Sequence, residues 1–169
     1  MDQPRSLSRE NLSTYLNDHV AGSVTALELL EHQAKNNSGT PLEDFFANLH
    51  VEITADQQVL RDLMRALQIE EGAIRKAGAW MVEKAGRVKL ALSNEEAGGA
   101  GFLQALEGLA LGITGKQLLW RSLAAAEEKV PQLHGPDYAR LEQRAAEQCA
   151  RVEVKRLAAA RAAFTRPNE

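Results

Sequence analysis

The fold is decided by residues 36–67, which read NNSGTPLEDFFANLHVEITADQQVLRDLMRAL. Thr40, Pro41 and Glu43 form a capping box with proline at the first helical position, a pattern that marks the start of a helix. We expect the Thr40 side chain to accept a hydrogen bond from the amide of Glu43, while the Glu43 carboxylate reaches back over the helix start. A new helix is therefore predicted directly after the Asn-Asn-Ser-Gly turn.

The rest of this stretch carries one apolar row at helical spacing. The row contains a single carboxylate: Leu42, Phe46, Leu49, Ile53, Asp56, Leu60, Leu63 and Leu67. Side chains that recur at alternating steps of three and four residues share one face of a helix. We therefore predict one long helix over residues 40–67, with an acidic group in the middle of its inward face.

The same periodicity predicts helices on both sides of this one. Apolar rows indicate helices over about 8–35, 72–92, 100–129 and 137–164. None of the five prolines interrupts such a row, and Ala and Leu, both strong helix formers, are abundant. The sequence thus predicts an all-α chain, and its 169 residues suit a single domain over 1–169.

Loop lengths predict how these helices connect. The tight turn after residue 35 makes the first two long helices antiparallel, and the short link before residue 137 does the same for the last two. The stretch over 72–92 is long enough to carry the chain back along the bundle as a crossover. Two antiparallel hairpins joined by one crossover form the connectivity of ferritin-like four-helix bundles.

Three phrases add to this agreement of helix lengths and order: Tyr15-Leu-Asn-Asp-His19, Trp80-Met-Val-Glu-Lys84 and Gly115-Lys-Gln-Leu-Leu-Trp120. With them the chain resembles the ferritin-like four-helix-bundle superfamily over roughly residues 8–165, and in particular an uncharacterised bacterial branch of it. The resemblance implies the bundle fold. It implies no activity, because fold alone does not specify function.

Metal-binding members of that superfamily use Glu-x-x-His motifs on two of their helices. None of the four histidines follows a glutamate at that spacing: His19, His32, His50 and His134. We therefore expect no di-iron site and no cofactor. The alternative is an altered or degenerate site for iron or manganese, and its candidate ligands are His19, Glu52, Asp56 and Glu107.

A polar layer is expected at the middle of the bundle. Counted from the turn at residues 37–38, His19 and Asp56 lie at the same height, and Ser23 lies opposite Glu52. The second hairpin brings Lys116 or Gln117, and Gln148 or Cys149, to the same level. Two interpretations stay open: the layer is the altered metal site, or Asp56 is neutralised by His19 or Lys116 and the layer fixes the register of the helices.

Other chemistry is not indicated. Cys149 lies on an inward apolar row, which favours a core residue over a reactive thiol. No nucleophile motif or phosphate-binding loop occurs, so we expect a non-catalytic structural or binding module. A small apolar ligand held between the helices near Gly108 and Gly112 is a third possibility, although close helix packing also explains these glycines.

Charge points to self-association. Residues 1–71 carry 5 basic and 12 acidic side chains, a net charge of −7, whereas the remaining 15 basic and 11 acidic side chains give +4. An acidic face of the first hairpin could meet a basic face of the last helix in a second chain, so we expect a homodimer. Nucleic acid binding is not expected, because no aromatic residues alternate with the basic ones. Without a membrane-spanning run or a secretory signal, the expected location is the cytoplasm.

Overall fold

The computed structural model describes residues 3–71 and 99–165, which form helices joined by turns. Its elements are α1 (Gln3–Asn36), α2 (Pro41–Ala66), α4 (Ala100–Glu127), the short 3₁₀ helix η1 (Pro131–Leu133) and α5 (Tyr138–Thr165). The predicted all-α class is confirmed for these residues. Most predicted helix ends lie within two residues of those observed, but α1 begins five residues earlier than expected. The crossover helix expected over 72–92 lies outside the described residues.

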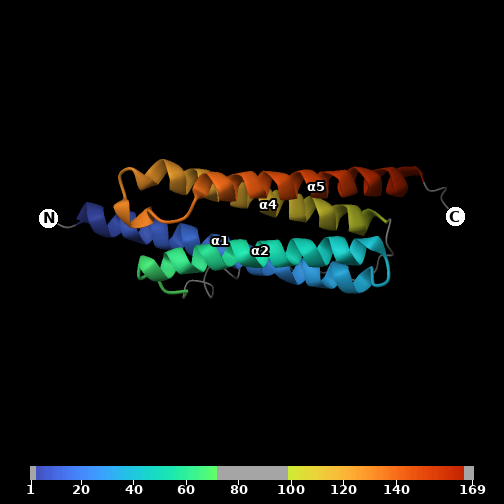
Figure 1. Ribbon diagram of the computed structural model, residues 1–169, viewed down its shortest axis with the longest axis horizontal. Helices are drawn as coiled ribbons and strands as arrows, with labels where there is room; N and C mark the ends of the chain where they lie inside the picture. The colour runs from blue at the N-terminus through green and yellow to red at the C-terminus, as the bar shows by residue number, and fades with distance from the viewer. Residues whose placement is uncertain (1–2, 72–98, 166–169) are drawn as a thin grey trace.

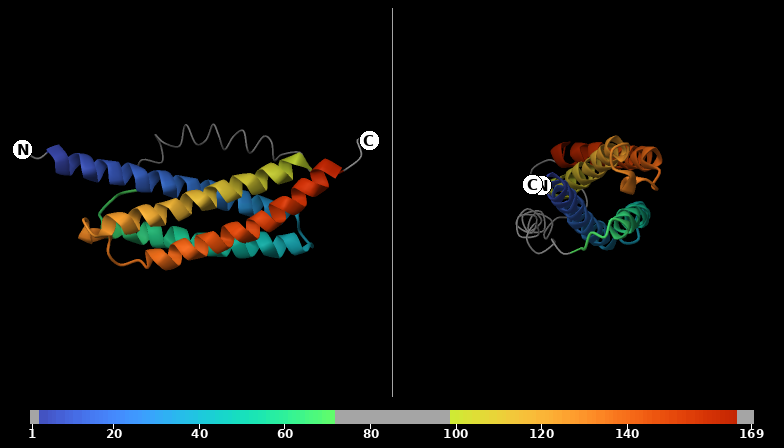
Figure 2. Two further views of the ribbon diagram at one scale, coloured as in Figure 1. Left: turned by 90° about the horizontal axis from the view of Figure 1, so that it is seen from above. Right: turned by 90° about the vertical axis from the view of Figure 1, so that its left-hand side faces the viewer.

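The four long helices pair as two antiparallel hairpins, α1 with α2 and α4 with α5 (Figure 1). The end of α2 and the start of α4 lie at opposite ends of the bundle, so these two helices run in the same direction (Figures 1 and 2). Among the described helices, none combines the length and apolar character needed to span a membrane.

The start of α2 is capped, though not with the predicted bonds. Thr40 Oγ1 accepts a hydrogen bond from the amide of Leu42 at 3.2 Å, so the prediction that the amide of Glu43 is the donor is wrong. The reason is local: Thr40 donates both its hydroxyl and its amide to the carbonyl of Asn37, which turns it towards the preceding loop. The Glu43 carboxylate does reach back, and it accepts from the amide of Gly39 at 2.7 Å.

The end of α2 is a Schellman motif with an unusual residue in it. The amide of Ile69 donates to the carbonyl of Met64 at 2.9 Å, and the amide of Gln68 donates to that of Arg65 at 3.0 Å. Gln68 has φ +53°, a left-handed conformation that favours glycine. From α1, Arg9 donates to the carbonyl of Gln68 at 3.0 Å, which satisfies one of the free acceptors at this helix end.

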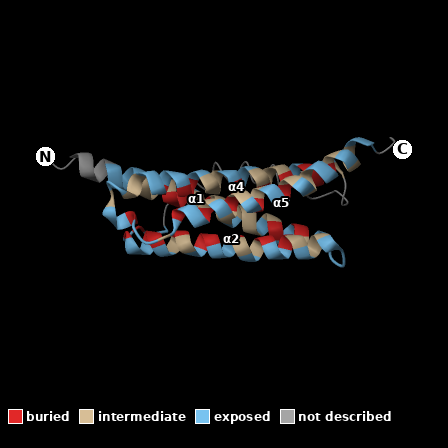
Figure 3. Ribbon diagram, turned by 45° about the horizontal axis from the view of Figure 1, so that its top comes forward, coloured by how far each residue is buried: buried red, intermediate tan, exposed pale blue. Residues whose placement is uncertain are grey.

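Buried residues follow the helices along the length of the bundle (Figure 3), and their apolar members form two clusters. One apolar cluster gathers around Leu16, Trp120 and Tyr138, and the other around Phe46, Leu106 and Val152. Between them along α2 lie the buried side chains of Asp56 and Gln57. The fold therefore sets a polar layer between two apolar halves, as expected from the sequence.

Candidate functional site

Asp56 is the centre of the polar layer. Its side chain is 1% exposed, and its carboxylate accepts hydrogen bonds from Lys116 on α4 and from Arg144 on α5. A buried carboxylate needs such partners, because an unpaired charge away from water is strongly unfavourable. Neutralisation of Asp56 by Lys116 is therefore confirmed, and Arg144 takes part as well.

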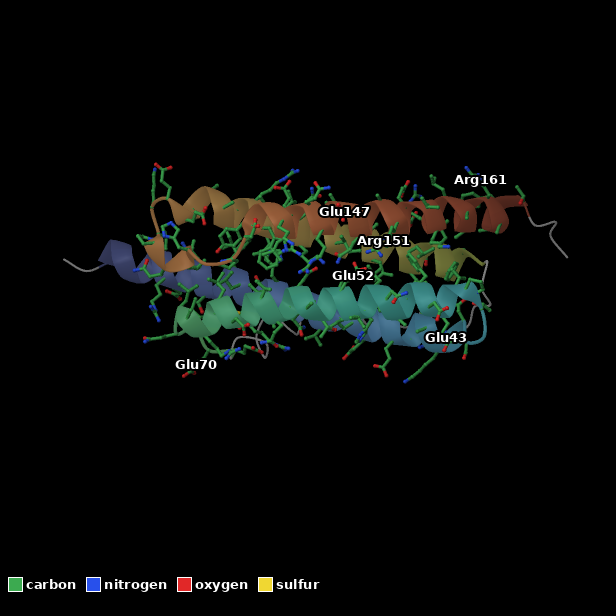
Figure 4. All side chains as sticks on the ribbon, viewed as in Figure 1. Glu43, Glu52, Glu70, Glu147, Arg151 and Arg161 are labelled. Atoms are coloured by element: carbon green, nitrogen blue, oxygen red, sulfur yellow. The ribbon has the colours of Figure 1, made fainter. Side chains whose placement is uncertain are left out.

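Gln148 connects the ion pair of Asp56 and Lys116 to a second ion pair, that of Glu52 and Arg151. It is fully buried; its Oε1 accepts from Lys116, and its Nε2 donates to Glu52 at 3.1 Å and to Asp56 at 3.3 Å. Glu52 in turn pairs with Arg151, and Figure 4 shows these two side chains facing each other between α2 and α5. The two carboxylates, the amide of Gln148 and the ammonium of Lys116 are thus held by protein partners from three helices, whereas the buried Nε of Arg144 has no partner in the described part of the chain.

The network shifts the pKa values of its members. Burial lowers the pKa of Lys116, and the neighbouring Asp56 carboxylate opposes that change only in part. Burial alone would raise the pKa of Glu52, but hydrogen bonds from Arg151 and Gln148 outweigh it and lower the pKa. The lowered pKa keeps Glu52 charged at neutral pH, whereas burial disfavours the charged form of Lys116.

On the other side of Asp56, α1 contributes a second set of polar groups. Gln57 donates to Ser23 Oγ at 2.8 Å and accepts from Arg61 at 2.6 Å. The ring of His19 packs edge-on against Tyr15, with 4.7 Å between ring centroids. Burial lowers the pKa of His19, and the nearby Asp18 opposes this only in part, so the imidazole is expected to be neutral at pH 7.

A cavity of about 630 Å³ lies between α1, α2 and α4 beside this layer. Its walls are mainly apolar: Ile53, Leu60, Ile113, Leu119 and Trp120. Small residues on the facing helices, among them Gly22, Ala26, Gly112 and Gly115, leave the space unfilled. The polar part of the wall consists of these side chains: Tyr15, Asp18, His19, Ser23, Asp56, Gln57 and Lys116. An apolar cavity with a few polar groups is the usual form of a small-molecule site.

Trp120, one of the residues that line this cavity, has a buried donor without a partner. Its side chain is 1% exposed, and within the described ranges its Nε1–H has no hydrogen-bond partner. Nearly all buried donors in folded proteins are paired with protein or ordered water. The Trp120 Nε1–H is therefore an exception among buried donors, and it is closed off from solvent.

The four candidate metal ligands are not brought together. Glu52 and Asp56 meet through Gln148, whereas His19 lies on the cavity wall and forms no hydrogen bond with Asp56. Glu107 lies apart, 3.6 Å from Arg156. Among residues 3–71 and 99–165, no group of three His, Cys, Asp or Glu side chains is placed to hold a metal ion.

Two expected neighbours differ from the observed ones. Ser23 contacts Gln57 and not Glu52, because Glu52 is drawn to Arg151 and Gln148 of α5. Cys149 is half-buried beside the core rather than enclosed by it, and its Sγ lies 3.7 Å from Thr114 Oγ1.

Arg144, Arg151 and Trp120 were missed in the sequence. Arg144 and Arg151 flank the predicted inward residue Gln148 by about one helical turn on either side, which is the signal that could have found them. Trp120 ends one of the three phrases quoted above, and no sequence pattern shows that its N–H lacks a partner.

Comparisons of the chain with protein-family models, curated proteins and solved structures gave no match.

Proposed function

We propose that this chain is a non-catalytic binding module that holds a small, mainly apolar molecule in the cavity between α1, α2 and α4. The observation that carries the proposal is the cavity itself, with a volume of about 630 Å³ beside a polar layer. Pockets of this size are typical of small-molecule sites. The Asp56 and Lys116 groups that border the cavity are bound to each other, which suits a structural role better than a catalytic one.

The proposal includes a ferritin-like bundle. The parallel course of α2 and α4 supports it, since a chain that leaves α2 at one end and enters α4 at the other needs a connection as long as the bundle (Figure 1). The proposal also includes a homodimer. Apolar side chains of α5 that face solvent, Val154, Leu157 and Phe164, are available to a second copy. Arg144 and Arg151 form ion pairs with α2 of the same chain, so these two positive charges of α5 are already balanced within the monomer.

Glycines of α4 provide the test of the cavity. A Cβ atom built at Gly112, Gly115 or Gly108 meets no atom within 4 Å, so a side chain can enter at each position. Gly112 and Gly115 line the cavity, whereas Gly108 does not. Replacing a mid-helix glycine by leucine also favours the helix by about 0.5–1 kcal/mol. The three substitutions therefore share their effect on the helix and differ in their effect on the cavity.

The experiment measures binding of 1,1-diphenylethylene, an uncharged hydrocarbon, by equilibrium dialysis. We expect the wild-type chain and Gly108→Leu to bind it alike, and Gly112→Leu with Gly115→Leu to bind it at least about tenfold more weakly while unfolding at equal or higher temperature. Absence of binding to the wild-type chain, or equal binding by the filled variant, would overturn the proposal. Sedimentation at micromolar concentration tests the dimer, which a mass of 18.5 kDa in solution would contradict.

A further inference from the structure

The outward face of α5 carries a second row of residues at helical spacing. The row consists of six exposed residues at alternating steps of three and four: Glu147, Ala150, Val154, Leu157, Arg161 and Phe164. Val154 is 66% exposed and Phe164 is 76% exposed, although both are large and apolar. Helices of separate chains pair through rows of this spacing. The row is therefore a candidate contact surface, and its charges indicate what it contacts.

The two charged residues of the row lie symmetrically about Val154. Glu147 precedes Val154 by seven residues and Arg161 follows it by seven, which is about 10 Å along the helix in each direction. Both lie on α5 in Figure 4, Glu147 near the middle of the helix and Arg161 towards its end. Among residues 3–71 and 99–165 neither forms an ion pair, and the Glu147 carboxylate accepts a hydrogen bond from Gln143 at 3.0 Å.

The other arginines in the second half of α5 already have partners within the chain. Arg151 pairs with Glu52 on α2, and Arg156 pairs with Glu153 of its own helix. Arg161 differs from both, because no carboxylate in the described part of the chain reaches it. Its charge is available to a carboxylate of another molecule.

A second copy of the chain complements this row when its α5 runs antiparallel. About a twofold axis at Val154, each Glu147 then faces Arg161 of the other copy. A parallel arrangement would place like charges opposite each other, which is unfavourable. In the antiparallel one, Ala150 faces Ala158 of the other copy, and both are exposed. Such small side chains beside the axis let the two helices approach closely.

We infer that two copies of this chain associate through an antiparallel pairing of α5 about Val154, with an ion pair between Glu147 and Arg161 at each end. This inference rests on the homodimer of the proposed function and goes beyond it by assigning the surface, the orientation and the register. It differs from the pairing expected from net charge, in which an acidic first hairpin meets a basic last helix. The apolar residues supply the affinity, and the charges select the antiparallel orientation.

The first test places a charge at the centre of the contact. Val154→Glu should raise the dissociation constant of the dimer at least about a hundredfold, because two carboxylates would meet at the twofold axis. Val51→Glu is the matched control, since Val51 is 68% exposed and lies on α2. It should leave the dissociation constant within about threefold of the wild-type value. Sedimentation equilibrium measures the constants, and circular dichroism checks that both variants are helical.

The second test exchanges the two charges. Glu147→Arg and Arg161→Glu should each weaken association about tenfold, because each leaves like charges facing each other at both ends of the contact. The variant with both substitutions restores opposite charges and should return to within about threefold of the wild-type constant. The single substitutions change the net charge of the chain in opposite directions, so general repulsion between chains would not weaken both.

Each outcome decides a different statement. A wild-type chain with a mass of 18.5 kDa at micromolar concentration would overturn the homodimer and this inference with it. If the wild-type chain is a dimer and Val154→Glu has no more effect than Val51→Glu, the α5 surface is overturned while the homodimer stands. If Val154→Glu dissociates the dimer but the charge exchange does not restore association, the antiparallel register about Val154 is overturned. Binding of 1,1-diphenylethylene tests the cavity separately from all of these.

Discussion

The ammonium group of Lys116 on α4 donates to the carboxylate of Asp56 on α2, and this ion pair joins the two hairpins at the middle of the bundle. Arg144 on α5 completes the arrangement, so that one acidic group balances bases from two other helices. Pairs of this kind are strongly sensitive to the loss of one partner, because the remaining charge is left buried.

Asp56→Asn is expected to lower the free energy of unfolding by about 3–5 kcal/mol, since Lys116 and Arg144 lose their shared counterion. Urea denaturation followed by circular dichroism measures the change. Asp62→Asn on the exposed side of the same helix is the matched control, with an expected change below about 1 kcal/mol. Equal effects of the two substitutions would show that the Asp56 contacts contribute little.

Replacing all three charged groups together should be far less harmful than replacing Asp56 alone. In Asp56→Leu, Lys116→Met and Arg144→Met combined, no uncompensated charge from this group remains, and apolar side chains can extend the core across the layer. Urea denaturation should show at least half of the stability lost in Asp56→Asn restored. A triple variant less stable than Asp56→Asn would contradict this account of the layer.

The lowered pKa of His19 predicts how the free energy of unfolding changes as the pH falls. Because burial holds the folded pKa below the ordinary value of 6.5, the unfolded chain takes up the proton first as pH falls. The His19 contribution to stability is therefore complete above pH 6.5 and declines from there towards the folded pKa. Unfolding free energies at pH 7.5 and 5.5 should differ less in His19→Gln than in the wild-type chain, and exposed His134→Gln should leave the difference unchanged.

Tyr138 predicts a loss of stability in alkali. Burial, with a smaller contribution from Glu127, raises its pKa from 10.0 to about 12, and its hydroxyl donates to the carbonyl of Leu133 at 2.5 Å. Between pH 10 and 12 the unfolded chain loses this proton while the folded chain retains it, so stability falls as pH rises. In Tyr138→Phe this part of the fall should disappear from melting curves recorded between pH 9 and 11.5. An unchanged fall would mean that other groups cause it.

Gln68→Gly should stabilise the chain. Gln68 holds φ +53° at the end of α2, a conformation that is unfavourable by about 1–2 kcal/mol for residues with a Cβ atom. Some of that gain is offset by the greater freedom of glycine in the unfolded chain, so we expect about 1 kcal/mol. Gln58→Gly, in the exposed interior of the same helix, should destabilise by a similar amount. Thermal unfolding of the two variants would contradict this assignment if both moved in the same direction.

The helices could be predicted because their periodicity is a property of the chain alone. The row from Leu42 to Leu67 indicates both the helix and its inward face, and the short loops fix which helices pair. Details of capping could not be predicted in the same way. Thr40 has one hydroxyl and two available neighbours, and the choice between the amides of Leu42 and Glu43 depends on the path of the preceding loop.

The height of the polar layer along the bundle could be predicted from the sequence, but the contacts within the layer could not. Counting residues places Asp56, Lys116 and Gln148 at one height, and all three meet there. The long side chain of Arg144 reaches the layer although Arg144 lies beside the inward row. A count of residues along the inward face alone therefore does not find it. The cavity has no sequence signal of its own, since glycines such as Gly112 can equally mark close packing of helices.

The division of the core by its polar layer has a consequence for folding. Each hairpin joins helices that follow each other closely in the chain, and such local contacts form quickly. The ion pairs of Asp56 and Glu52 lie between the hairpins, so charges must leave water only when the two halves dock. Docking of the two hairpins is therefore expected to be the slow step of folding. Raised salt should alter the docking rate more than the rate at which either hairpin forms.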